Sequence, residues 1–200
     1  SAPARSRKKW WNKTVLAGFT IIAINVARAC GSHATLKALV SSVIEDITNW
    51  AAVFVSECDA STNNLDFEED AHLQFRHMPG RGSRPMRWIV NSRYKSNFKS
   101  CKWLGRAGAI TLGNTCIIGV HNGLGTSLTA SLLDAAKLVK HRPWGTNPIV
   151  VGDHNIDILP VQACDPRCLL PDRNPKHLEE RSLLYAWLES TGLRVNVPNA

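Results

Sequence analysis

The sequence contains four apolar runs rich in β-branched residues, and each run is followed directly by polar residues. Runs of this kind predict buried strands, because β-branched side chains pack well on a pleated sheet. One fold can therefore bring the polar residues together at one edge of a sheet. The four segments in which a run ends are Ile24-Asn25-Val26, Ser56-Glu57, Val120-His121 and Gly152-Asp153-His154-Asn155.

Strand-like and helix-like periods alternate along the chain, which indicates one α/β domain. The first unit is a strand at 18–26, a helical stripe from 36 to 50 that begins after Ser32, and a strand at 52–55. Residues 58–85 include a Gly- and Pro-rich run and are expected to form a long excursion between strands. Further strands are expected at 86–94, 103–112, 115–121, 148–151 and 194–197, and further helices around 128–139 and 184–188.

The positive charge of the chain, +8 in formal terms, is unevenly distributed. A basic arm precedes the first strand, and no acidic residue lies between Asp70 and Asp134. Such a stretch creates a positive field that attracts a polyanion, although a solvated face on a basic protein is the alternative. The basic residues of this interval are Arg76, Arg81, Arg84, Arg87, Arg93, Lys95, Lys99, Lys102 and Arg106.

The six cysteines show no tight disulfide framework, and Cys164 and Cys168 lack the second ligand pair of a zinc site. This usage is typical of a reducing, intracellular protein. The apolar stretch at 15–26 supplies the first strand, so we do not interpret it as a signal peptide. No apolar run approaches the roughly 20 residues that cross a bilayer, and the protein is expected to be soluble.

In order and approximate spacing, the four polar segments resemble the endonuclease/exonuclease/phosphatase superfamily, which includes DNase I-like nucleases. Its usual signatures are strands ending in Asn, in Gln-Glu, in His or Tyr, and in Gly-Asp-Phe-Asn. The sequence is most similar to the endonuclease domains of non-LTR retrotransposons, over roughly residues 19–197. That finer likeness lies in Pro79-Gly80-Arg81-Gly82-Ser83, in Trp103-Leu104-Gly105-Arg106-Ala107-Gly108 and in residues 151–160.

The resemblance implies a four-layer α/β-sandwich, in which two packed mixed sheets are flanked by helices. It divides the chain into a basic N-terminal arm at 1–18 and one domain at 19–200. The superfamily normally closes with a Ser-Asp-His segment that supplies a catalytic His and its Asp partner. The sequence contains no such segment, so the domain is expected to be incomplete at its C-terminus and impaired in catalysis.

The resemblance also implies a catalytic role for five residues. Glu57, with Asn25 and Asp153, is expected to hold Mg²⁺ or Mn²⁺, because hard cations prefer oxygen ligands. Asp153 would orient or deprotonate the attacking water, and Asn155 would hydrogen-bond the phosphate. His121 would contact the scissile phosphate and assist the leaving group. Each of these residues also has an ordinary structural reading, as a strand-end or turn residue.

The expected function is therefore Mg-dependent phosphodiester hydrolysis of nucleic acid, DNA rather than RNA, by an endonuclease domain of retrotransposon type. Arg28, Arg84 and Arg106 are expected to contact phosphates. The second hypothesis is an inactive nuclease-fold subunit with a binding or structural role, completed or anchored by other protein chains. A small-molecule phosphatase is the third. The expected location is intracellular, nuclear for a retrotransposon endonuclease, without membrane association or secretion.

Overall fold

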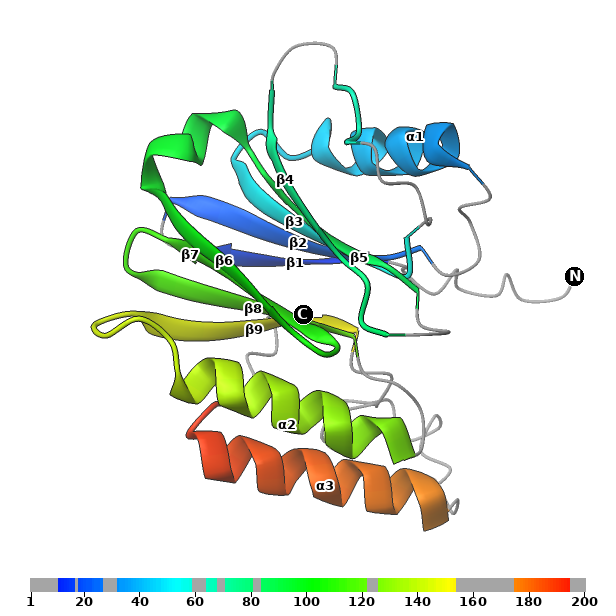
Figure 1. Cartoon of the computed structure of the whole chain (residues 1–200), viewed down its shortest axis with the longest axis vertical. Coiled ribbons are helices and arrows are strands. Elements are labelled where there is room, and N and C mark those ends of the chain that lie inside the picture. The colour runs from blue at the N-terminus through cyan, green and yellow to red at the C-terminus, as the bar shows by residue number, and fades with distance from the viewer. Residues whose placement is uncertain are drawn as a thin grey trace, which may run out of the picture.

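The computed structural model describes residues 11–16, 18–26, 32–58, 64–67, 71–80, 84–121, 126–153 and 175–194. Two strand–helix–strand units organise the fold (Figure 1). The first joins β2 (Phe19–Asn25) to the parallel strand β3 (Trp50–Ser56) through α1 (His33–Ile44). The second joins β8 (Thr115–His121) to the parallel strand β9 (Asn147–Asp153) through α2 (Thr126–Lys140). Because paired strands are parallel, both strands of a unit end at the same edge of their sheet.

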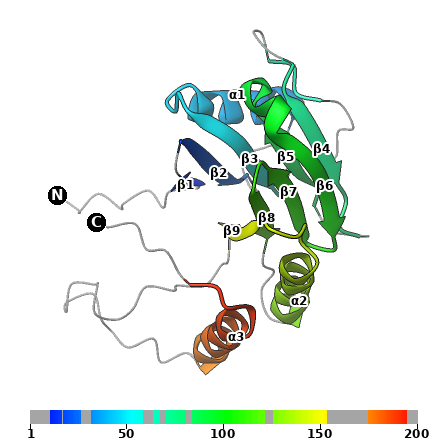
Figure 2. The same ribbon diagram turned by 90° about the vertical axis from the view of Figure 1, so that its left-hand side faces the viewer.

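Antiparallel strands complete two sheets around these units. The first sheet has the order β1-β2-β3-β5-β4 and the second the order β6-β7-β8-β9. Figure 2 shows four layers: α1, the first sheet, the second sheet, and α2 with α3. This arrangement confirms the predicted α/β-sandwich. The remaining elements are β1 (Trp11–Leu16), β4 (Leu73–His77), β5 (Met86–Val90), the 3₁₀ helix η1 (Ser92–Asn97), β6 (Phe98–Leu104), β7 (Ala107–Leu112) and α3 (Pro175–Thr191).

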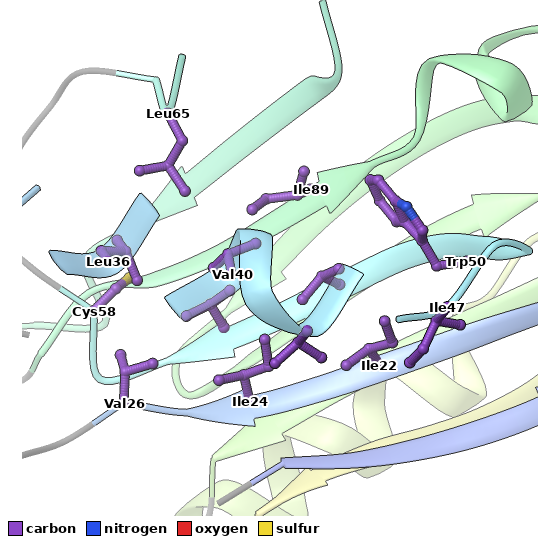
Figure 3. Close-up of a cluster of buried hydrophobic side chains, with 13 residues drawn as sticks. Ile22, Ile24, Val26, Leu36, Val40, Ile47, Trp50, Cys58, Leu65 and Ile89 are labelled. Carbon is purple, nitrogen blue, oxygen red and sulfur yellow. The ribbon is translucent and has the colours of Figure 1, made fainter. Parts of the chain in front are cut away.

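Helix α1 covers the outer face of the first sheet. Ser32 caps it, since its hydroxyl accepts a hydrogen bond from the Thr35 N–H at 3.2 Å. The helix buries a stripe with a spacing of three to four residues, which fits a period of 3.6. These side chains meet the outward-facing residues of β2, β3 and β5 in one apolar cluster (Figure 3). The cluster includes Ile22, Ile24, Leu36, Val40, Val43, Val53, Val55 and Ile89.

The second core lies between the sheets. Phe54 of β3 and Trp88 of β5 pack there with ring centroids 5.1 Å apart. Gly119 of β8 faces the Phe54 ring so closely that a Cβ at this position would overlap with it. The close approach of the two sheets in the middle of the sandwich therefore depends on a glycine.

Four expectations about the elements were wrong in detail. The strand expected at 86–94 ends at Val90, and the 3₁₀ helix η1 follows it. Residues 73–77, expected within the excursion, form β4, whose alternating pattern turns Leu73 and Phe75 toward the core between the sheets. The expected strand at 103–112 is instead divided by a two-residue turn, because Gly105 adopts a φ of +50°. Residues 11–16, expected in the basic arm, pair with β2 as β1, so that Trp11 opposes Ile24. Of the expected strand at 194–197, residues 195–197 lie outside the described part.

Three free thiols lie in the described residues, and Cys58 and Cys116 are buried, as expected of small apolar side chains. Burial raises the pKa of the Cys101 thiol to about 12. No helix in the described residues is both long enough and apolar enough to span a membrane.

The contact between Gly119 and Phe54 predicts an overpacking defect. Gly119→Ala should lower the free energy of unfolding by about 1–3 kcal/mol, because the added methyl group has no space in the core. Urea denaturation of the variant and the wild type measures this change. Introducing Phe54→Leu into the Gly119→Ala background should recover part of the loss. If the two substitutions are simply additive, the overlap is not the cause.

Candidate active site

The carboxyl ends of β2, β3, β8 and β9 meet at one edge of the sandwich, which we call the site edge. In the first sheet, Asn25 pairs in register with Ser56, the residue before Glu57. In the second sheet, His121 pairs with Asp153. The four predicted segments therefore end side by side in two pairs, one pair in each sheet.

An ion pair joins the two sheets at this edge. The Nε2 atom of His121 lies 2.7 Å from the Oε1 atom of Glu57, which is ion-pair distance for a protonated imidazole, while the orientation of the two groups does not meet hydrogen-bond geometry. Both side chains are mostly buried, with 15% of the His121 side chain and 21% of the Glu57 side chain exposed. Water therefore screens the pair less than it would a pair on the open surface.

The backbone of Glu57 is unusual. Its φ of 55° lies in the left-handed region, where it is the one residue other than glycine in the described part of the chain. For a residue with a Cβ this conformation costs roughly 1–2 kcal/mol. The next residue, Cys58, fixes the turn, since its N–H and its thiol both donate to the Pro85 carbonyl, at 3.0 and 3.1 Å. Strain of this kind is typical of functional sites.

Two of the arginines expected to contact phosphate lie at the site edge. The Nη1 atom of Arg84 is 3.5 Å from the Oε2 atom of Glu57, and 58% of the Arg84 side chain is exposed. Arg106 lies in the turn between β6 and β7, and its carbonyl accepts a hydrogen bond from the His121 N–H at 3.2 Å. The Arg84 side chain thus lies next to Glu57, and the backbone of Arg106 lies next to that of His121.

The sequence analysis missed the support of the Arg106 turn. His77, the last residue of β4, lies with Nε2 2.9 Å from the Gly105 carbonyl and stacks on Trp103, with ring centroids 5.0 Å apart. The Trp103 ring also lies over Gly108, where a Cβ would collide with it. His77 could have been found only by recognising β4 as a strand that ends at the same edge.

The remaining predicted residues are placed less completely. Asn25 is half-buried at the end of β2, and Asp153 is described at the backbone alone, beside His121. Asn155 and Arg28 lie outside the described residues. No group of three or more His, Cys, Asp or Glu side chains forms a metal cage within the described ranges. The Glu57 carboxylate at this edge nevertheless fits Mg²⁺, which keeps several waters and needs only one or two protein carboxylates.

Gly152 controls the spacing of the last strand pair. Its φ is 142°, and a Cβ there would collide with the backbone carbonyl of Val120 on β8. Gly152→Ala should lower the free energy of unfolding by about 3 kcal/mol or more, since strain and a backbone clash combine. Thermal or urea unfolding measures the loss. Gly113→Ala is the matched control, because its φ of 58° imposes strain in open space. Equal losses would show that the clash with β8 is unimportant.

No family model and no curated protein matches the chain. Among the solved structures similar to it are two proteins of low sequence identity. One is a D. rerio TDP2 humanized by 14 mutations, with a TM-score of 0.51 and 16% identity over 69% of this chain and 63% of that one. The other is the 3′ phosphatase NExo from Neisseria bound to a product DNA hairpin, with a TM-score of 0.57 and 14% identity over 84% of this chain and 70% of that one. The chain thus shares the fold of these proteins, an α/β-sandwich of two mixed sheets flanked by helices.

Proposed function

We propose that the protein hydrolyses phosphodiester bonds of nucleic acid with the help of a divalent cation, as a DNA endonuclease domain of retrotransposon type. The observation that carries the proposal is the 2.7 Å contact between His121 and Glu57. It brings together, from two sheets, a carboxylate and an imidazole that the sequence places 64 residues apart. An acidic ligand beside a proton donor is what cleavage of a phosphodiester requires.

Glu57, Asn25 and Asp153 are the residues that would hold Mg²⁺ or Mn²⁺. When bound, such a cation neutralises phosphate charge and lowers the pKa of a bound water. The left-handed backbone of Glu57 aims its carboxylate at the edge of the second sheet, where His121 meets it. The side chain that would contact the cation is therefore fixed by the backbone before any ligand arrives.

His121 is suited to hold a proton beside the phosphate. Its backbone N–H donates to the Arg106 carbonyl, and its imidazole lies against the Glu57 carboxylate. An imidazole in this position can donate to a phosphate oxygen or to the leaving group near neutral pH. Asp153 follows on the neighbouring strand, and we assign to it the orientation of the attacking water. Asn155 would hydrogen-bond the phosphate.

Three lines of support favour nucleic acid as the substrate, and the third of them favours DNA. Nucleic acid fits the excess of basic residues, since phosphate contacts dominate its binding. Arg84 and Arg106 flank the candidate site, and we assign Arg28 to the same contact surface. One structure of the same fold is bound to a DNA hairpin. The retrotransposon assignment rests on the amino-acid sequences of the Pro79–Ser83 and Trp103–Gly108 segments.

A specific observation favours a second candidate function. Both oxygens of Glu57 already have cationic or donor neighbours, His121 on Oε1 and Arg84 on Oε2. A carboxylate engaged in this way must give up at least one partner to bind a cation. An inactive nuclease-fold subunit, which binds nucleic acid or other protein chains without cleaving, would keep the carboxylate paired.

The two candidates differ in metal-dependent cleavage. Glu57→Gln should lower the rate of plasmid nicking in Mg²⁺ or Mn²⁺ by about 100-fold or more, and His121→Ala by about 10²- to 10⁴-fold. The measurement is conversion of supercoiled plasmid to open circle, with EDTA as the metal-free control. Glu45→Gln, at an exposed position at the far end of α1, is the matched substitution and should leave the rate unchanged.

Purified wild-type protein that binds DNA but shows no nicking in either metal would favour the binding subunit. If the Glu57→Gln variant nicks plasmid at the wild-type rate, Glu57 has no role in the reaction. A rate equal in EDTA and in Mg²⁺ would exclude the cation from the reaction.

A further inference from the structure

Five basic residues follow one another along the edge strand of the second sheet and the two segments that flank it. Strand β6 is the edge strand of this sheet, η1 leads into it, and the Gly105-Arg106 turn follows it. Four of the five side chains are exposed, and that of Arg106 is half-buried. We call this series the β6 edge, and its members are Arg93, Lys95, Lys99, Lys102 and Arg106.

A β-bulge places Lys99 on this edge. The register of β6 against β7 shifts between Phe98 and Ser100, which leaves Lys99 as the extra residue. The shift also lets Phe98, Cys101 and Trp103 all pack toward the core between the sheets. Lys102, between two of these, faces outward. The bulge thus keeps the apolar side of the strand buried while its lysines stay in solvent.

The β6 edge leads to the candidate active site. Strands β6 and β8 are both antiparallel to β7, so β6 ends at the site edge, as β8 does. At that end the Arg106 carbonyl accepts the His121 N–H, and the Gly105 carbonyl is held by His77. From Lys99 to Leu104, the residue before the Gly105-Arg106 turn, the strand spans roughly 17 Å at about 3.3 Å per residue, the length of about five base pairs of duplex.

The surroundings of the β6 edge are also basic. No acidic residue occurs from 71 to 133, and helix α2 adds the exposed Lys137 and Lys140. Burial raises the pKa of the Cys116 thiol on β8, while its hydrogen bond to Thr111 and the charges of Arg142 and Lys102 lower it. Two cations from different elements therefore act on the same outer face. Asp134 of α2 approaches this edge at Gly105, at the end nearest the site.

Edge lysines have a common structural use, since they stop an edge strand from pairing with another chain. That use accounts for Lys99 and Lys102. It does not account for Arg93 and Lys95, which precede the strand in η1. It also does not account for the continuation of the charge to Arg106, in the turn beside His121.

We propose that the β6 edge binds the phosphate backbone of duplex DNA on one side of the bond that is cleaved at the site edge. The proposal rests on the proposed function for the identity of its ligand. Contacts to phosphates carry no sequence information, so this surface fixes the orientation of the duplex on the protein. Figure 2 shows β6 on the side of the sandwich away from α3, which leaves the β6 edge uncovered by that helix.

The test measures binding apart from cleavage. A fluorescent 20-base-pair duplex is titrated in EDTA at several salt concentrations, with fluorescence anisotropy as the readout. The doubly substituted Lys99→Gln/Lys102→Gln protein should bind roughly tenfold more weakly at low salt, and its log K against log salt slope should fall by about 2. The Lys99→Arg/Lys102→Arg protein, which keeps the charges, should bind like the wild type.

Lys13→Gln supplies the matched control, because Lys13 is exposed on β1, an edge strand of the other sheet. It should leave the affinity and the salt slope unchanged. Melting temperatures of all variants should agree, which excludes unfolding as a cause of weaker binding.

The outcomes separate this proposal from the proposed function. If the glutamine variant binds duplex as tightly as the wild type while nicking persists, the β6 edge is not a DNA-binding surface. The proposed endonuclease function is then retained. If binding weakens as expected but the wild type shows no nicking, the β6 edge is retained as a DNA-binding surface. The proposed endonuclease function is then rejected. Tighter binding to an RNA duplex of the same length, or to phosphatidylserine vesicles, would overturn the assignment to DNA.

Discussion

The candidate site depends on parallel pairing within the two strand–helix–strand units. Pairing of β2 with β3 places Asn25 opposite Ser56, and pairing of β8 with β9 places His121 opposite Asp153. A one-residue slip in either pair would turn every side chain of a strand to the other face. The continuous burial of β3 and the central residues of β8 makes such a slip costly, so the registers that bury the core also align the polar strand ends.

The packing of the two sheets against each other then brings the aligned polar strand ends of both sheets into one site. Each unit alone supplies half of it, a carboxylate and an amide from the first sheet and an imidazole from the second. Phe54 against Gly119 sets how closely the sheets approach, and the contact between Glu57 and His121 shows the result at the edge. The strained backbone of Glu57 is the local cost of turning the carboxylate toward the second sheet.

Much of this could be predicted from the sequence, because buried parallel strands appear as unbroken β-branched runs. Asn25, Glu57 and His121 were found as polar residues at the ends of such runs. The Glu57–His121 distance could not be predicted, since nothing in either run states how the sheets face one another. Strand β4 was missed because its short alternating pattern lies between Gly- and Pro-rich segments, and His77 was missed with it. The Gly105 turn was missed because Ala and Gly on both sides of it continue an apolar run.

The direction of β1 has a practical consequence. Since β1 is antiparallel to β2, Trp11 lies opposite Ile24, one residue before Asn25, whereas Leu16 lies at the other end of the sheet. Any module fused upstream of Trp11 is consequently tethered close to the site edge. A short linker would hold it there at millimolar effective concentration. A purification tag fused upstream of Trp11 would compete with ligands, and a targeting module joined at the same point would deliver its cargo to the reacting groups.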